Sequence, residues 1–182
     1  MAALLPILAA AALYGVSTRN QDVQYTKATV DGRSYLVLKR KDARDAANLL
    51  AMVRRDLESL VAHVAKQSPD DSDFARLAKK FNPEAVSEGS PGSGYTSYTI
   101  DKASVVLCIR QSSGDFVPKN VIMYVAIHEL AHIMTSTVGH TPEFWANNTR
   151  LLDAAKQIGI YEPQDFSKTP QPYCGMHIGS GE

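Results

Sequence analysis

Two histidines and a glutamate stand close together in the least polar part of the chain. They belong to the run HELAH, from His128 to His132, inside a segment from about residue 119 to 136 that is apolar on nearly every side. Such a segment is predicted to be an interior helix, where unpaired imidazole and carboxylate groups are costly. Residues four apart lie one turn apart on a helix, so His128 and His132 can reach one tetrahedral zinc ion. Glu129 is offset from that line and predicted to act on a metal-bound water as general base.

A catalytic zinc ion needs a third protein ligand and an open fourth position. The nearest candidate is His140, which follows Gly139 eight residues after His132. Thr141 and Pro142 are typical of an N-cap followed by proline at the first helical position. His140 is therefore expected on a turn between two helices, the second ending near residue 158. The alternative is a His140 that only forms hydrogen bonds near the site.

The two motifs together resemble a known group of enzymes. HELAH followed by GHTPEFW is similar to the zinc metallopeptidases of the WLM and SprT (Spartan) type, zincins in which the HExxH helix precedes a Gly-His-x-x-x-Phe turn. The resemblance implies Zn²⁺ bound by His128, His132 and His140, with Glu129 as the catalytic carboxylate. The segment YCGMHI, residues 173–178, resembles viral and protist relatives of that group.

The resemblance also implies a reaction and a class of substrate. A zinc-dependent endopeptidase acts on a protein or peptide, and members of this group act on protein covalently attached to DNA. Nineteen Lys and Arg residues balance nineteen Asp and Glu residues, so net charge does not support a nucleic-acid partner. We therefore carry over the reaction and not the DNA-linked substrate. The alternative function is a zinc-binding structural or interaction protein without turnover.

The remaining pattern predicts an α+β fold. We expect a small zincin-like domain over residues 21–182, in which a mainly antiparallel sheet packs on the HExxH helix and a further helix follows the third ligand. The predicted elements are a hairpin over 23–40 turning at Asp31-Gly32, a helix from an Asp42 N-cap to about 64, a short helix over 74–81, a loop over 88–94 and a second hairpin over 95–110.

Three groups of residues outside the motifs carry further predictions. Residues 2–16 are apolar and uncharged, so residues 1–20 are predicted to form an anchor or signal segment that associates an otherwise soluble intracellular protein with a membrane; the alternative is an N-terminal helix packed on the domain. Cys108 and Cys174 can pair only if their segments meet. The polar residues nearest the motifs are Tyr161, Tyr173 and His177, which we expect to be structural.

Overall fold

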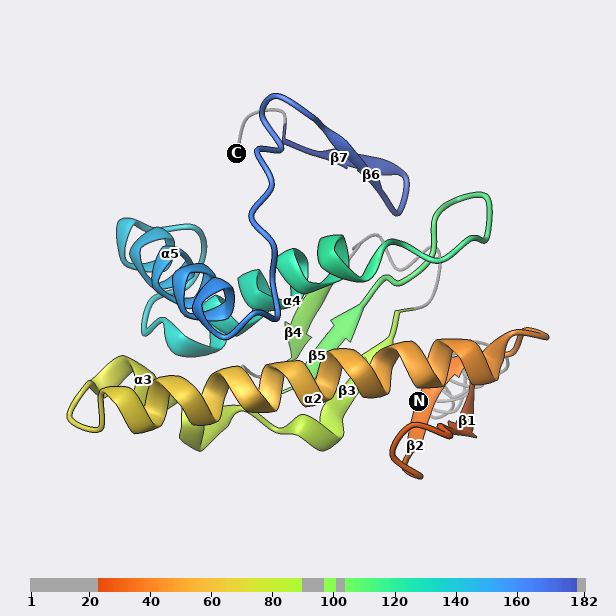
Figure 1. The fold of residues 1–182 in the computed structure, drawn as a ribbon, viewed down its shortest axis with the longest axis horizontal. Helices are drawn as coiled ribbons and strands as arrows, with labels where there is room; N and C mark the ends of the chain where they lie inside the picture. The colour runs from red at the N-terminus through yellow and green to blue at the C-terminus, as the bar shows by residue number, and fades with distance from the viewer. Residues whose placement is uncertain (1–22, 90–96, 101–103, 180–182) are drawn as a thin grey trace, which may run out of the picture.

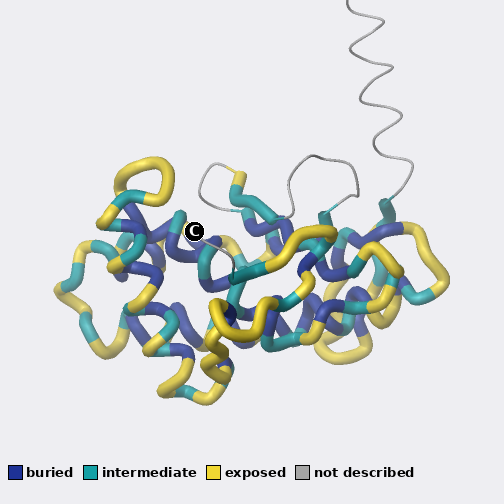
Figure 2. The backbone as a smooth tube through the Cα atoms, turned by 90° about the horizontal axis from the view of Figure 1, so that it is seen from above, coloured by how far each residue is buried: buried dark blue, intermediate teal, exposed yellow. Residues whose placement is uncertain are grey.

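The computed structural model describes residues 23–89, 97–100 and 104–179. The predicted anchor or signal segment over residues 1–20 lies outside the described residues. Within the described ranges, no helix combines the length and the apolar character needed to cross a bilayer. Figure 2 shows buried residues through the middle of the molecule and exposed ones at its turns. The membrane association predicted from residues 2–16 rests on residues that the structure does not describe.

The N-terminal elements form a hairpin followed by a long helix. Strand β1 (Val23–Lys27) pairs antiparallel with β2 (Ser34–Leu38), and Gly32 takes the positive φ of 74° that a tight turn requires. Helix α2 (Ala43–Gln67) buries the apolar stripe that its 3.6-residue periodicity predicts. Both predicted elements are confirmed, and α2 runs the length of the molecule along one side (Figure 1).

Asp42 occupies the predicted N-cap position but does not act as a cap. Its side chain makes no capping hydrogen bond. Instead it pairs with Arg110, which is 6% exposed and also donates to Glu88 at 2.7 Å. Arg110 lowers the pKa of Asp42 because its guanidinium hydrogen-bonds and attracts the carboxylate. The Asp42 carboxylate therefore pairs with a buried arginine that is distant in sequence, instead of capping its own helix.

The central sheet has three strands in the order β3, β5, β4. Strand β5 (Ser104–Leu107) pairs antiparallel with β4 (Tyr98–Ile100), as the predicted second hairpin requires. Strand β3 (Val86–Glu88) pairs parallel with β5. The predicted loop over 88–94 is thus wrong at its first residue, because Glu88 belongs to a strand whose pairing partner lies far along the chain. Residues 90–94 lie outside the described part.

Helix α4 (Lys119–Met134) carries the HELAH run through the interior. It contacts α2, α3 (Ser72–Lys80) and α5 (Pro142–Gln157), and also strands β4 and β5. The short 3-10 helix Pro83–Ala85 joins α3 to β3. Elements on several sides of α4 explain why its sequence is apolar almost all round. Figure 1 shows α4 lying between the sheet and the C-terminal segments.

The C-terminal segment crosses α4 and ends in a hairpin of β6 (Gln171–Tyr173) and β7 (Met176–Ile178). A disulfide joins Cys174, in the hairpin turn, to Cys108, directly after β5. Gln111 supports the same junction by donating to the carbonyl of Pro172 at 2.6 Å and accepting from the Cys174 amide at 3.1 Å. The two segments whose meeting the sequence left open are therefore joined, and the hairpin is held above α4.

Candidate metal centre

The three motif histidines converge on one point. Each of His128, His132 and His140 offers a ring nitrogen, and these nitrogens all lie within 4.8 Å of one another. The Nε2 atoms of His128 and His140 are 3.0 Å apart. The rings of His132 and His140 are also close together, with 5.1 Å between their centroids. Three imidazole nitrogens are a donor set of the kind that holds catalytic zinc, so the residues present fit a zinc ion.

Phe144 forms the floor beneath the three imidazoles. It is fully buried, and its ring stacks on His132 with 4.3 Å between centroids. The rings of His128 and His140 each lie 4.8 Å from the same phenyl ring. Trp145 packs against His140 at 5.4 Å. The first turn of α5 therefore orients imidazoles that come from two different elements.

The sequence prediction assigned Phe144 no part in the metal centre. The available signal was its place in the Gly-His-x-x-x-Phe turn, four residues after the third histidine. Periodicity cannot distinguish a phenylalanine that fills the core from one that supports imidazole rings. The difference is visible only once α4 and α5 are packed together.

Burial sets the protonation of the site. Burial, followed by repulsion from His132 and His140, lowers the pKa of His128 to about 3, so its imidazole is neutral, the form that binds metal. Glu129 is 5% exposed, and burial raises its pKa to about 7. A carboxyl group with that pKa can both take up and release a proton near neutral pH.

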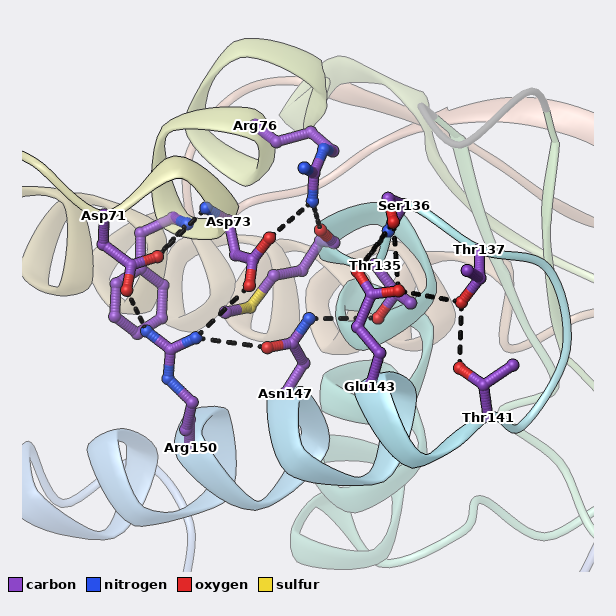
Figure 3. A network of polar contacts seen from close by, with 12 residues as sticks. Asp71, Asp73, Arg76, Thr135, Ser136, Thr137, Thr141, Glu143, Asn147 and Arg150 are labelled. Atoms are coloured by element: carbon purple, nitrogen blue, oxygen red, sulfur yellow. Dashed lines mark hydrogen bonds and ion pairs between the residues drawn. The ribbon is translucent and has the colours of Figure 1, made fainter.

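The carboxyl end of α4 is tied to its neighbours by a polar network (Figure 3). Arg76 of α3 donates to the carbonyl of Met134 at 2.5 Å. Asn147 of α5 donates to the Thr135 hydroxyl at 3.2 Å and accepts from Arg150 at the same distance. These bonds keep the end of the motif helix in register with α5, which carries the phenyl floor.

This chain is similar in sequence and in fold to known proteins. Residues 115–159 match the family model described as YgjP-like, metallopeptidase domain. The crystal structure of Wss1 from Saccharomyces cerevisiae is similar, with a TM-score of 0.51 and 19% identity over 68% of this chain and 87% of that chain. A Wss1 mutant matches with a TM-score of 0.50 and 18% identity over 68% and 90%. The chain therefore has the fold of Wss1, and residues 115–159, which carry the three histidines, resemble a metallopeptidase domain.

Viral proteins are similar to this chain in sequence. A protein of Acanthamoeba polyphaga mimivirus is 27% identical over 97% of this chain and 92% of its own length. A protein of Invertebrate iridescent virus 3 is 42% identical, and one of Invertebrate iridescent virus 6 is 38% identical. The chain spans 50% and 46% of the length of those two proteins. These similarities agree with the resemblance to viral relatives seen in residues 173–178.

The histidine cluster opens into a cleft of about 1440 Å³. Its walls come from β4, α4, the turn before α5, α5 itself and the C-terminal segment with the β6–β7 hairpin. Glu129 and all three histidines line it. A molecule larger than a single side chain can therefore reach the imidazoles.

The three polar residues expected to be structural occupy different positions in this cleft. Tyr173 is 1% exposed, and its hydroxyl is 2.6 Å from the Ser97 Oγ atom. The Tyr161 hydroxyl accepts from the Gln164 amide at 3.4 Å. His177 lines the cleft from the exposed hairpin, and Met176 beside it is 44% exposed.

Thr141 provides the N-cap of α5 that the sequence predicts, since its hydroxyl accepts from the Phe144 amide at 3.3 Å. We expect Thr141→Ala to lower the free energy of unfolding by about 1 kcal/mol, because the cap bond is lost and the amide is left without its partner. Urea unfolding monitored by circular dichroism measures the change. Thr149→Ala, at an exposed mid-helix position, is the control; equal stability of the two variants would contradict the capping role.

Proposed function

We propose that the chain is a zinc-dependent endopeptidase. The observation that carries the proposal is the cluster of three imidazole nitrogens within 4.8 Å, set beside the buried Glu129 on the wall of an open cleft. A structural zinc site is closed by four protein ligands, whereas a catalytic site keeps one position for a reacting water. Among the described residues, the cluster contains three donors. That count favours turnover over the alternative of a purely structural zinc site.

Under this proposal His128, His132 and His140 hold the zinc ion. When bound, zinc lowers the pKa of a water molecule and polarises the peptide carbonyl. The packing of all three imidazoles on Phe144 fixes their orientation before any metal arrives. A preorganised set of ligands loses little freedom on binding.

Glu129 acts as the base under the same proposal. Its carboxylate accepts the proton that the attacking water loses and then donates that proton to the leaving amine. Burial supports both halves of this role, because it raises the pKa of Glu129 to about 7. Burial raises the pKa of the Tyr173 hydroxyl. The charge of the nearby Glu129 carboxylate raises that pKa further.

The proposed substrate is an extended protein or peptide segment. Strand β4 is at the edge of the sheet as described, and residues 97–99 line the cleft. An extended segment can add to such an edge as a further strand, through backbone hydrogen bonds that demand little of the side chains. We therefore expect denatured proteins to be cleaved faster than folded ones.

Metal analysis combined with a cleavage assay tests the function. We expect one equivalent of zinc per chain by elemental analysis, cleavage of casein, loss of cleavage on addition of a chelator and recovery on return of zinc. Zinc without cleavage of casein or denatured proteins would favour the structural alternative. A chain that binds no zinc would overturn both readings.

A further inference from the structure

The turn that carries His140 is held by few apolar contacts. Residues 135–141 connect α4 to α5, and Val138 at the middle of this connection is 87% exposed. A Cβ atom built on Gly139 would meet nothing within 4 Å. The His140 ring packs on Phe144, but the backbone that delivers it is largely in solvent. Polar contacts must therefore define the course of this turn.

Glu143, in the first turn of α5, accepts the hydrogen bonds that hold this connection (Figure 3). Its Oε1 atom accepts from the Ser136 amide and from the Ser136 hydroxyl, both at 2.9 Å. Its Oε2 atom accepts from the Thr137 hydroxyl at 2.9 Å, and lies 3.0 Å from the Ser136 hydroxyl. One carboxylate thus joins the start of the connection to the helix that follows it. We call Ser136, Thr137 and Glu143 the loop clamp.

The charge of Glu143 strengthens the loop clamp. Hydrogen bonds from the Ser136 amide and hydroxyl, followed by one from Thr137, lower the pKa of Glu143 to about 2. The carboxylate is therefore ionised at neutral pH, and hydrogen bonds to an ionised acceptor are stronger than neutral ones. Its position near the helix N-terminus also favours a negative charge.

The loop clamp is continuous with the N-cap of α5. The Thr137 hydroxyl, which donates to Glu143, is also 2.9 Å from the Thr141 hydroxyl. Thr141 directly follows His140 in the chain. Thr137 before His140 and Thr141 after it are therefore linked to each other, and Thr137 links this pair to the Glu143 carboxylate, while Val138 and Gly139 are exposed.

We propose that Glu143 is a positioning residue for His140, holding the third imidazole in place for metal through the loop clamp. The inference rests on the proposed zinc site and adds to it a residue that touches neither metal nor substrate. Partners that orient a metal ligand typically contribute a factor of about 10–100 to metal affinity. We expect a contribution of that size from Glu143.

Glu143→Gln tests the proposal with zinc affinity as its readout. We expect zinc affinity, measured by competition with a chromophoric chelator, to fall by about 10–100-fold, because the amide has one acceptor oxygen and no charge. The visible absorption spectrum of the Co²⁺-substituted variant should change as the third imidazole loosens. Glu162→Gln is the matched control, since Glu162 is exposed and no described hydrogen bond or ion pair involves its side chain. We expect that control to bind zinc as the unaltered chain does.

A double-mutant cycle separates the clamp from a simple helix-capping role. Ser136→Ala removes one donor without altering α5, and we expect it to weaken zinc binding in the same direction. The effects of Ser136→Ala and Glu143→Gln should be less than additive, because both variants break the same contact. If Glu143→Gln fails to fold, Ser136→Ala alone decides the question.

The outcomes keep this inference apart from the proposed function. Zinc affinity of Glu143→Gln or Ser136→Ala within twofold of the unaltered chain would overturn the positioning role while leaving the peptidase proposal intact. Lower thermal stability with unchanged zinc affinity would identify Glu143 as a helix cap only. An unaltered chain that binds no zinc would overturn both proposals.

Discussion

Replacing Glu129 by glutamine is expected to lower the rate of peptide cleavage by about 10²–10⁴-fold while one equivalent of zinc remains bound. The reason is that glutamine keeps the size of the side chain but cannot accept the proton of the attacking water. Zinc should stay because the donor cluster consists of His128, His132 and His140. Single-turnover cleavage of a fluorogenic peptide and elemental analysis of the same sample measure the two effects.

The Glu129→Gln variant should fold at least as well as the unaltered chain. Burial disfavours the ionised carboxylate, as the raised pKa of Glu129 indicates, and a neutral amide avoids that penalty. Loss of activity therefore cannot be attributed to unfolding if the thermal midpoint is unchanged or higher. Retained cleavage would show that another group is the base, and loss of zinc would show that Glu129 is a ligand.

Removing the disulfide between Cys108 and Cys174 is expected to lower the free energy of unfolding by about 4 kcal/mol. The bridge closes a loop over a sequence separation of 66 residues, and its loss restores that freedom to the unfolded chain. For a chain of this size, the change corresponds to a fall of roughly 8–16 °C in the melting temperature. Thermal and urea unfolding of the Cys108→Ser/Cys174→Ser double variant measure it.

The same variant reports on how the β6–β7 hairpin is held over the cleft. Without the bridge, the hairpin keeps its contacts through Gln111 and the Tyr173 hydroxyl. We therefore expect the variant to remain folded and to bind zinc, but to cleave less efficiently because one wall of the cleft is less constrained. The unaltered chain treated with a non-chelating reductant is the control for the serine side chains. A loss of stability below about 1 kcal/mol would contradict the entropic account.

Local sequence patterns were sufficient to predict α4 and the segments that follow it. The HELAH run, the glycine before His140 and the Thr-Pro pair each depend on residues a few positions apart, and α4, the connection and α5 follow them closely. The hairpin turn at Asp31-Gly32 has the same local origin. Helix periodicity, turn geometry and capping act over one or two turns of chain, so a single sequence contains all the information that they need.

The same local patterns do not predict which residues distant in sequence pair with each other. Strand β3 has no counterpart among the predicted elements, and its last residue, Glu88, falls in the predicted loop, because these three residues form a strand only through β5. The sequence predicts Asp42 as an N-cap, but its carboxylate instead pairs with a buried arginine 68 residues away. The sequence does not decide whether Cys108 and Cys174 pair, for the same reason. Two cysteines 66 residues apart pair only where the fold brings their segments together.

The identity of the three candidate ligands and of the base was a matter of residue type and spacing, and the sequence alone predicted them. What surrounds them was decided by tertiary structure: the phenyl floor of Phe144, the loop clamp of Glu143 and the hairpin wall above the cleft. Periodicity reports which side of a helix is buried but not which residue it is buried against. That second property depends on contacts between elements, which exist only after the chain has folded.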